Sequence, residues 1–240
     1  RAGQGGGERN IYGANAYIMK RIGALAEQED VAFMQFTGDL INGYGTRPGD
    51  MKLQYANWMR SIEPFAHYLP TYTSPGNHEA YLQRFDNNTR YGLTVDKFPF
   101  DQHSAETLFS RHFDNPDNGP QSEDGAAYDP NPDQPDFPDY KETAFHYTYG
   151  NVAMIALNSD YWYSPSIEAV PEVGGNLHGY IMDQQLAWLR QTLEQYESNK
   201  GIDHIFLTLH TPFFPNGGHV DDDMWYSGSN KTRPTVNVKA

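Results

Sequence analysis

Short segments that predict β-strands alternate with helical patterns along this chain, and polar residues closely follow three of these runs. The runs lie at 31–36, 70–74, 152–157 and 205–209; 70–74 is Pro-Thr-Tyr-Thr-Ser, and the other three are mostly apolar. Apolar residues at helical spacing occupy 14–25, 53–62 and 183–193. Asp39, Asn77 with His78, and His210 stand at or just beyond the ends of their runs. In α/β sheets the carboxyl ends of strands are where ligand sites gather, so we expect these side chains to meet.

The composition excludes several classes of protein and limits the residues that could bind a metal. The 240 residues suit one large domain, and no apolar window approaches the roughly 18 residues of a spanning helix. A formal net charge of −14 repels a nucleic-acid backbone and attracts a metal cation. Because cysteine is absent, disulfides and thiolate ligands are excluded, which leaves His, Asp, Asn and Glu as ligands.

The middle of the chain has weaker periodicity. A helix is predicted at 105–113, and the tract at 114–139 is rich in Asp and Pro, which predicts loop and not core. Its carboxylates suit calcium if the protein is extracellular, or they form a solvated acidic surface loop. After this tract, 143–149 and 152–157 flank Gly150-Asn151 and predict a hairpin.

Asp39 lies in Phe-Thr-Gly-Asp-Leu-Ile-Asn and has the chemistry of a bridging metal ligand. A carboxylate has two oxygens and a negative charge, and Gly38 allows the backbone to approach a site closely. A Gly-Asp pair is also common in ordinary turns.

Asn77 and His78 belong to the quartet Gly-Asn-His-Glu. The amide oxygen of Asn77 can ligate a metal while His78 exchanges a proton or donates a hydrogen bond. The alternative is that Asn77 caps a helix. His210 can present a neutral imidazole to a metal, or it is an ordinary residue at the end of a strand.

The order of these segments resembles that of the calcineurin-like metallophosphoesterase family, which includes the purple acid phosphatases. The resemblance covers about 31–214 and rests on Gly-Asp, Gly-Asn-His-Glu, the Gly-Asn hairpin, Asp-Gln-Gln-Leu-Ala-Trp-Leu and the strand ending in His-Thr-Pro. It implies a four-layer αββα sandwich of two mixed sheets flanked by helices. It also implies one domain over 1–240, with an insertion at about 80–142 that forms a lid over the cleft.

The same resemblance implies the roles of the site residues. Asp39 bridges two metal ions, Asn77 and His210 ligate the second ion, and His78 stabilises or protonates the leaving group. The expected reaction is attack of a metal-bound hydroxide on a phosphate monoester or diester at a dinuclear centre of manganese, iron or zinc. Purple acid phosphatases place a Tyr three residues after the bridging Asp, where this chain has Asn42, so a ferric-tyrosinate centre is disfavoured.

Two motifs of the family, an opening Asp-x-His and a closing Gly-His-x-His, are not found. We therefore expect a domain truncated at both ends; Gly218-His219-Val220-Asp221 resembles the closing motif only in part. The rival hypothesis is a non-catalytic scaffold that retains a degenerate form of the fold. The acidic, cysteine-free composition favours a secreted, periplasmic or cell-surface protein.

Overall fold

The computed structural model describes residues 9–43, 45, 47–81, 100–127, 129, 132–135, 137–161 and 181–214. For 9–14, 100 and 103 it describes the backbone alone. The partial match to a closing motif at 218–221 lies outside these residues.

Helices and strands alternate along the described chain, as the sequence predicts. The helices are α1 (Arg9–Gln28), α2 (Pro48–Ala66), the 3-10 turn η1 (Asn77–Glu79), α3 (Phe100–His103), α4 (Ala105–Ser110) and α5 (Asp183–Ser198). The strands are β1 (Met34–Phe36), β2 (Thr71–Thr73), β3 (Phe145–Tyr149), β4 (Val152–Ala156) and β5 (His204–Thr208). Two sheets form: β1 pairs with β2 in parallel, while β4 pairs antiparallel with β3 and parallel with β5. The mixed α/β class with two sheets is confirmed.

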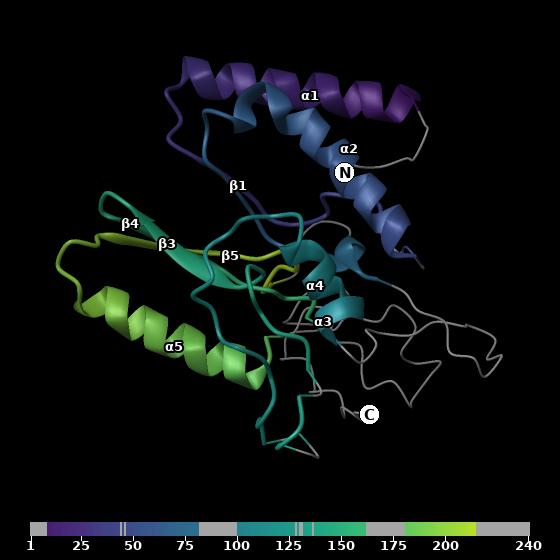
Figure 1. The fold of residues 1–240 in the computed structure, drawn as a ribbon. Helices are drawn as coiled ribbons and strands as arrows, with labels where there is room; N and C mark the ends of the chain where they lie inside the picture. Colours follow the sequence, from purple (N-terminus) through teal and green to yellow (C-terminus); the bar gives the residue numbers. More distant parts are fainter. Residues whose placement is uncertain are drawn as a thin grey trace.

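The two sheets pack against each other through aromatic and polar side chains. Tyr72 of β2 stacks on Tyr147 of β3 with ring centroids 3.8 Å apart. The Tyr147 hydroxyl also donates a hydrogen bond of 3.1 Å to Gln35 of β1. Helices α1 and α2 lie on one side of these sheets and α5 on the other (Figure 1). This is the αββα layering that the resemblance implies.

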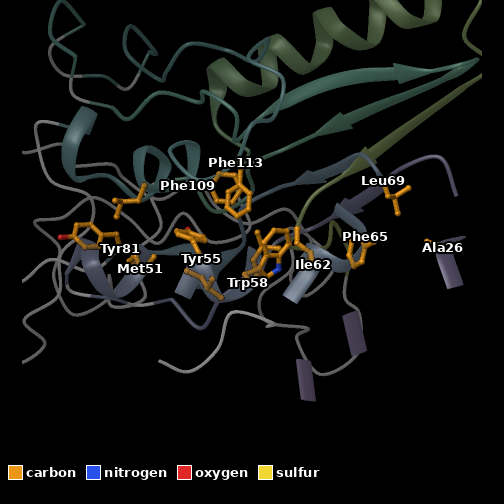
Figure 2. Close-up of a cluster of buried hydrophobic side chains, with 13 residues drawn as sticks. Ala26, Met51, Tyr55, Trp58, Ile62, Phe65, Leu69, Tyr81, Phe109 and Phe113 are labelled. Atoms are coloured by element: carbon orange, nitrogen blue, oxygen red, sulfur yellow. The ribbon is translucent and has the colours of Figure 1, made fainter. Parts of the chain in front are cut away.

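The core on the α2 side is aromatic. Trp58 packs edge-on against Phe36 of β1 and against Phe113, and Tyr55 contacts Phe109 and Phe113 (Figure 2). Of the apolar residues that predict this helix, Trp58 and Ile62 are buried, whereas Leu53 is half exposed. Each fully buried side chain of this size contributes about 1.5–3 kcal/mol by leaving water.

Helix α1 includes the predicted helical segment at 14–25 and extends beyond it at both ends, and it does not bury the bulky apolar residues of that segment. Its bulky apolar side chains are exposed, namely Tyr17, Ile18, Ile22 and Leu25. The helix instead contacts α2 through small residues: a Cβ atom placed at Gly23 is 2.6 Å from the Phe65 ring, and Ala26 is buried. Among the helices that the structure describes, none combines the length and apolar character of a membrane-spanning segment.

The Asp- and Pro-rich tract is irregular, as predicted, but the prediction that it lies outside the core is wrong. Glu123, Phe137 and Tyr140 are all buried. The Glu123 carboxylate accepts hydrogen bonds from the backbone N–H groups of Gln184 and Gln185 and from the Tyr140 hydroxyl. Glu123 therefore caps the N-terminus of α5, where the unpaired N–H groups of a helix need acceptors.

Candidate metal centre

The loops that follow β1 and β2 touch each other. Because these strands are parallel neighbours, their carboxyl ends meet at one edge of the sheet. A Cβ atom placed at Gly38 is 2.6 Å from the backbone nitrogen of Gly76, so the approach requires glycine. Gly38 and Asp39 both have left-handed backbone angles, φ 98° and φ 56°. This turn brings Asp39 beside the Gly-Asn-His-Glu segment.

Three side-chain atoms from three distant loops converge at this edge. Nε2 of His210 lies 3.3 Å from Oδ1 of Asp39 and 3.1 Å from Oδ1 of Asn77. His210 reaches this position because its loop lies against Gly76, where an added Cβ atom is 2.8 Å from the imidazole ring. Asp39 and His210 keep about one fifth of their side-chain surface accessible. The cluster is therefore partly open to solvent.

The hydrogen bonding of His210 determines what the cluster can hold. Nδ1 lies 2.9 Å from the carbonyl oxygen of Thr37, and a carbonyl only accepts, so Nδ1 carries the proton. In the neutral ring, the lone pair of Nε2 then faces two oxygens that also carry lone pairs. Three arrangements remove this repulsion: a proton on Nε2, a metal cation between the atoms, or an Asn77 amide turned so that its NH₂ group faces Nε2.

The spacing of the three atoms fits a metal ion. Nitrogen and oxygen ligands lie about 2.0–2.2 Å from zinc, which places neighbouring ligands roughly 3.0–3.5 Å from one another. The distances of 3.1 and 3.3 Å around His210 fall in this interval. A carboxylate, an amide oxygen and an imidazole form a mixed N/O set of the kind that manganese, iron and zinc accept.

His78 lies at the edge of this cluster. Its backbone N–H donates to Oδ1 of Asp39 over 3.3 Å. Its Nδ1 lies 2.6 Å from the carbonyl oxygen of Asn42 and donates to it. This bond fixes the tautomer, so any exchange of a proton with a bound molecule goes through Nε2. Asn42 thus contributes its backbone where the purple acid phosphatases contribute a Tyr side chain.

Glu79 holds the two loops together from behind. Its carboxylate accepts hydrogen bonds from the N–H groups of Asp39, Leu40, Ile41 and Gly76, at 2.6–3.2 Å. Burial raises the pKa of Glu79 to about 8; the nearby Asp39 carboxylate adds to the rise, and the N–H donors lower it. With both oxygens committed to the backbone, Glu79 fixes the position of Asp39 and does not ligate a metal itself.

The structure brings Asp39, Asn77 and His210 together and places His78 beside them. Within the described segments, no group of three or more His, Cys, Asp and Glu side chains is placed to share a metal ion. The cluster here has two such residues and is completed by the amide of Asn77. Sequence reasoning missed the carbonyl of Thr37 and gave no role to Glu79, although Glu79 is part of the quartet that it singled out.

The Asp- and Pro-rich tract borders a separate cavity of about 700 Å³. Its lining includes Asp101, Asp117, Asp124 and Asp139, with Lys141 as a positive charge among them. Calcium binding by this tract stays a prediction, as does its role as a lid.

Comparison with known proteins gives one family. The sequence model of the calcineurin-like phosphoesterase family matches residues 11–236, which is nearly the whole chain. A search of curated proteins finds no match.

Proposed function

This chain belongs to the calcineurin-like phosphoesterase family, and we propose that it hydrolyses a phosphate ester at the cluster of Asp39, Asn77 and His210. Membership of the family indicates metal-dependent phosphoester hydrolysis. The observation that carries the assignment to this cluster is the position of Nε2 of His210, which lies 3.3 Å from Oδ1 of Asp39 and 3.1 Å from Oδ1 of Asn77, the spacing of ligands around one metal ion.

We assign the three side chains as ligands of one divalent ion. The Asp39 carboxylate has a second oxygen, which suits it to bridge to a second ion in a dinuclear centre. When bound, such ions neutralise charge on the phosphoryl oxygens and lower the pKa of a bound water. The chain itself supplies the orientation: Thr37 fixes the His210 tautomer, and Glu79 fixes the Asp39 loop.

His78 assists the leaving group. Its Nδ1 is held by the Asn42 carbonyl, so Nε2 is the atom that donates a hydrogen bond or a proton to the departing oxygen. The backbone bond from His78 to Asp39 ties this general acid to the metal ligand. Displacement of Asp39 therefore also displaces His78.

The test measures metal content and turnover of the full-length protein. Manganese, iron and zinc are quantified, and hydrolysis of bis-p-nitrophenyl phosphate and p-nitrophenyl phosphate distinguishes diesterase from monoesterase activity. The variants are Asp39→Asn and His78→Ala. The control is His67→Ala, because His67 is an exposed histidine at the C-terminal end of α2, and its ring contacts only the Glu63 carbonyl and the Tyr68 ring among the described residues.

We expect Asp39→Asn to lose both metal and turnover. His78→Ala retains the metal and loses about 10²- to 10⁴-fold in kcat, the usual contribution of a general acid. His67→Ala behaves as the wild type. A full-length protein that binds no metal and hydrolyses neither substrate contradicts the proposal and supports the scaffold hypothesis.

A further inference from the structure

A second buried network lies behind His210, at the ends of β4 and β5. After β4 the chain continues through Asn158, Ser159 and Asp160, all of them buried. Thr211 follows His210 and is also buried. Because β4 and β5 are parallel neighbours, these two segments leave the same edge of the sheet together (Figure 1).

The network holds Thr211 by both its backbone and its side chain. The Thr211 N–H donates to Oγ of Ser159 over 3.0 Å. The Ser159 hydroxyl in turn donates to Oδ2 of Asp160 over 2.8 Å. The Thr211 hydroxyl reaches the same carboxylate, 3.3 Å from Oδ2 and 3.5 Å from Oδ1. Asp160 is thus the acceptor at the end of both routes from Thr211.

The segment that carries Asp160 is itself anchored. The Asp160 N–H donates to the side chain of Asn158 over 3.0 Å. Gln185 of α5 pairs with the backbone of Asn158 on both sides, accepting from its N–H and donating to its carbonyl. The carboxylate of Asp160 therefore has a fixed location relative to the sheet and to α5.

We propose that Asp160 is a positioning residue for the metal centre: with Ser159 it fixes Thr211, and thereby the backbone that aims Nε2 of His210 at Asp39 and Asn77. This rests on the proposed function, since it assumes that His210 is a metal ligand. Apart from the contacts of Nε2 within the cluster, the imidazole bonds to the scaffold through Nδ1, which donates to the Thr37 carbonyl. A second restraint on the adjacent residue removes the freedom of the His210 backbone to turn away.

Outer partners of this kind change metal affinity. Removal of a group that orients a ligand typically weakens metal binding by about 10- to 100-fold. Asp160→Ala removes both carboxylate oxygens and with them the acceptors of the Ser159 and Thr211 hydroxyls. Thr211→Val keeps the shape of the side chain and deletes the hydroxyl, while Thr211→Ser keeps the hydroxyl.

Thr192 of α5 supplies a matched control. It is 4% exposed, compared with 2% for Thr211, and its hydroxyl donates to the Trp188 carbonyl over 2.9 Å. Thr192→Val therefore deletes an equally buried, hydrogen-bonded hydroxyl in a helix that contributes no ligand. The fall in Tm of Thr192→Val measures the stability lost when a buried hydroxyl is removed far from the metal ligands.

The experiment titrates the full-length protein, freed of metal, with Mn²⁺ and follows the unbound ion by electron paramagnetic resonance. We expect Asp160→Ala and Thr211→Val to weaken Mn²⁺ binding about 10-fold or more. Thr211→Ser and Thr192→Val stay within about twofold of the wild type. Turnover of Thr211→Val recovers at high Mn²⁺, because the variant loses ligand orientation and not the ligand.

The contrary outcomes are separable. If His210→Ala weakens Mn²⁺ binding while Thr211→Val binds as tightly as Thr192→Val, the positioning role is wrong and the proposed metal site stands. A loss in Thr211→Val with unchanged binding in Asp160→Ala also overturns the role of Asp160. If His210→Ala itself binds Mn²⁺ normally, the metal site and the positioning role are both wrong.

Discussion

Replacement of Glu79 by glutamine tests how strongly the two ligand loops depend on one carboxylate. Oε1 accepts from the N–H groups of Leu40 and Ile41, and Oε2 accepts from those of Asp39 and Gly76. Glutamine retains one acceptor oxygen and presents an NH₂ group in place of the other. Two of the four backbone N–H groups then face the NH₂ group of glutamine, which cannot accept a hydrogen bond, and the site is buried from water.

The magnitude follows from the number of lost bonds. Above the pKa of Glu79, about 8, the carboxyl is ionised, so unfolding is measured at about pH 9. Hydrogen bonds to a charged acceptor contribute about 1.5–3 kcal/mol each, so two lost bonds cost about 3–6 kcal/mol there. Glutamine also removes the cost of burying a charge, the same cost that raises the pKa of Glu79, and this offsets part of the loss. The expected decrease in the free energy of unfolding is about 2–4 kcal/mol.

The assay is thermal unfolding by calorimetry, with Glu142→Gln as the matched control. Glu142 is also largely buried, but its carboxylate accepts only a long hydrogen bond of 3.4 Å from the Asn115 N–H and lies 3.8 Å from the exposed Lys141 ammonium. We expect Tm to fall by roughly 4–16 °C for Glu79→Gln and by a few degrees or less for Glu142→Gln. Equal Tm values for Glu79→Gln and the wild type refute the view that this carboxylate holds the loops.

Two further predictions concern stability away from the centre. Asn115→Ala removes the partners of the Thr73 N–H and carbonyl, both buried, and we expect a loss of about 2–4 kcal/mol in urea unfolding. Asn118→Ala deletes a similar pair of bonds to the His146 backbone at an exposed site, so water replaces them and the loss stays below about 1 kcal/mol. Burial lowers the pKa of His146, so the folded state resists its protonation and stability falls as pH drops below 6.5. In urea unfolding at pH 7.5 and 5.5, His146→Gln is expected to show a smaller difference than the wild type; an equal difference contradicts this.

Local patterns were sufficient to predict most helices and strands. The apolar rows of α2 and α5 and the hairpin around Gly150 are short-range signals, and the structure confirms them. The exposed row of α1 could not be predicted as exposed, because helical spacing identifies an apolar face without showing what covers it. Here the small residues Gly23 and Ala26 set the contact with α2.

Long-range contacts account for the part of the fold that the sequence did not predict. Glu123 caps α5 from 61 residues away, and Asn115 completes the hydrogen bonding of β2 from 42 residues away. Both residues lie in a tract whose composition predicts loop. Composition reports how polar a segment is, whereas burial of these residues depends on which distant N–H groups need an acceptor.

The side chains of the candidate centre were predictable, because each follows a strand. The same pattern also occurs at Asn158-Ser159-Asp160, directly after the run that contains β4, so this segment could have been identified in the same way. The carbonyls of Thr37 and Asn42 could not be identified, since every residue has a carbonyl and only the folded backbone selects these two.

Anomalous X-ray diffraction from crystals soaked in Mn²⁺ tests the central claim most directly, because it locates the ion without reference to activity. The account predicts a manganese peak bounded by Oδ1 of Asp39, Oδ1 of Asn77 and Nε2 of His210, and no such peak in His210→Ala. A wild-type crystal with no peak at these three atoms, or with manganese bound only elsewhere on the molecule, contradicts it.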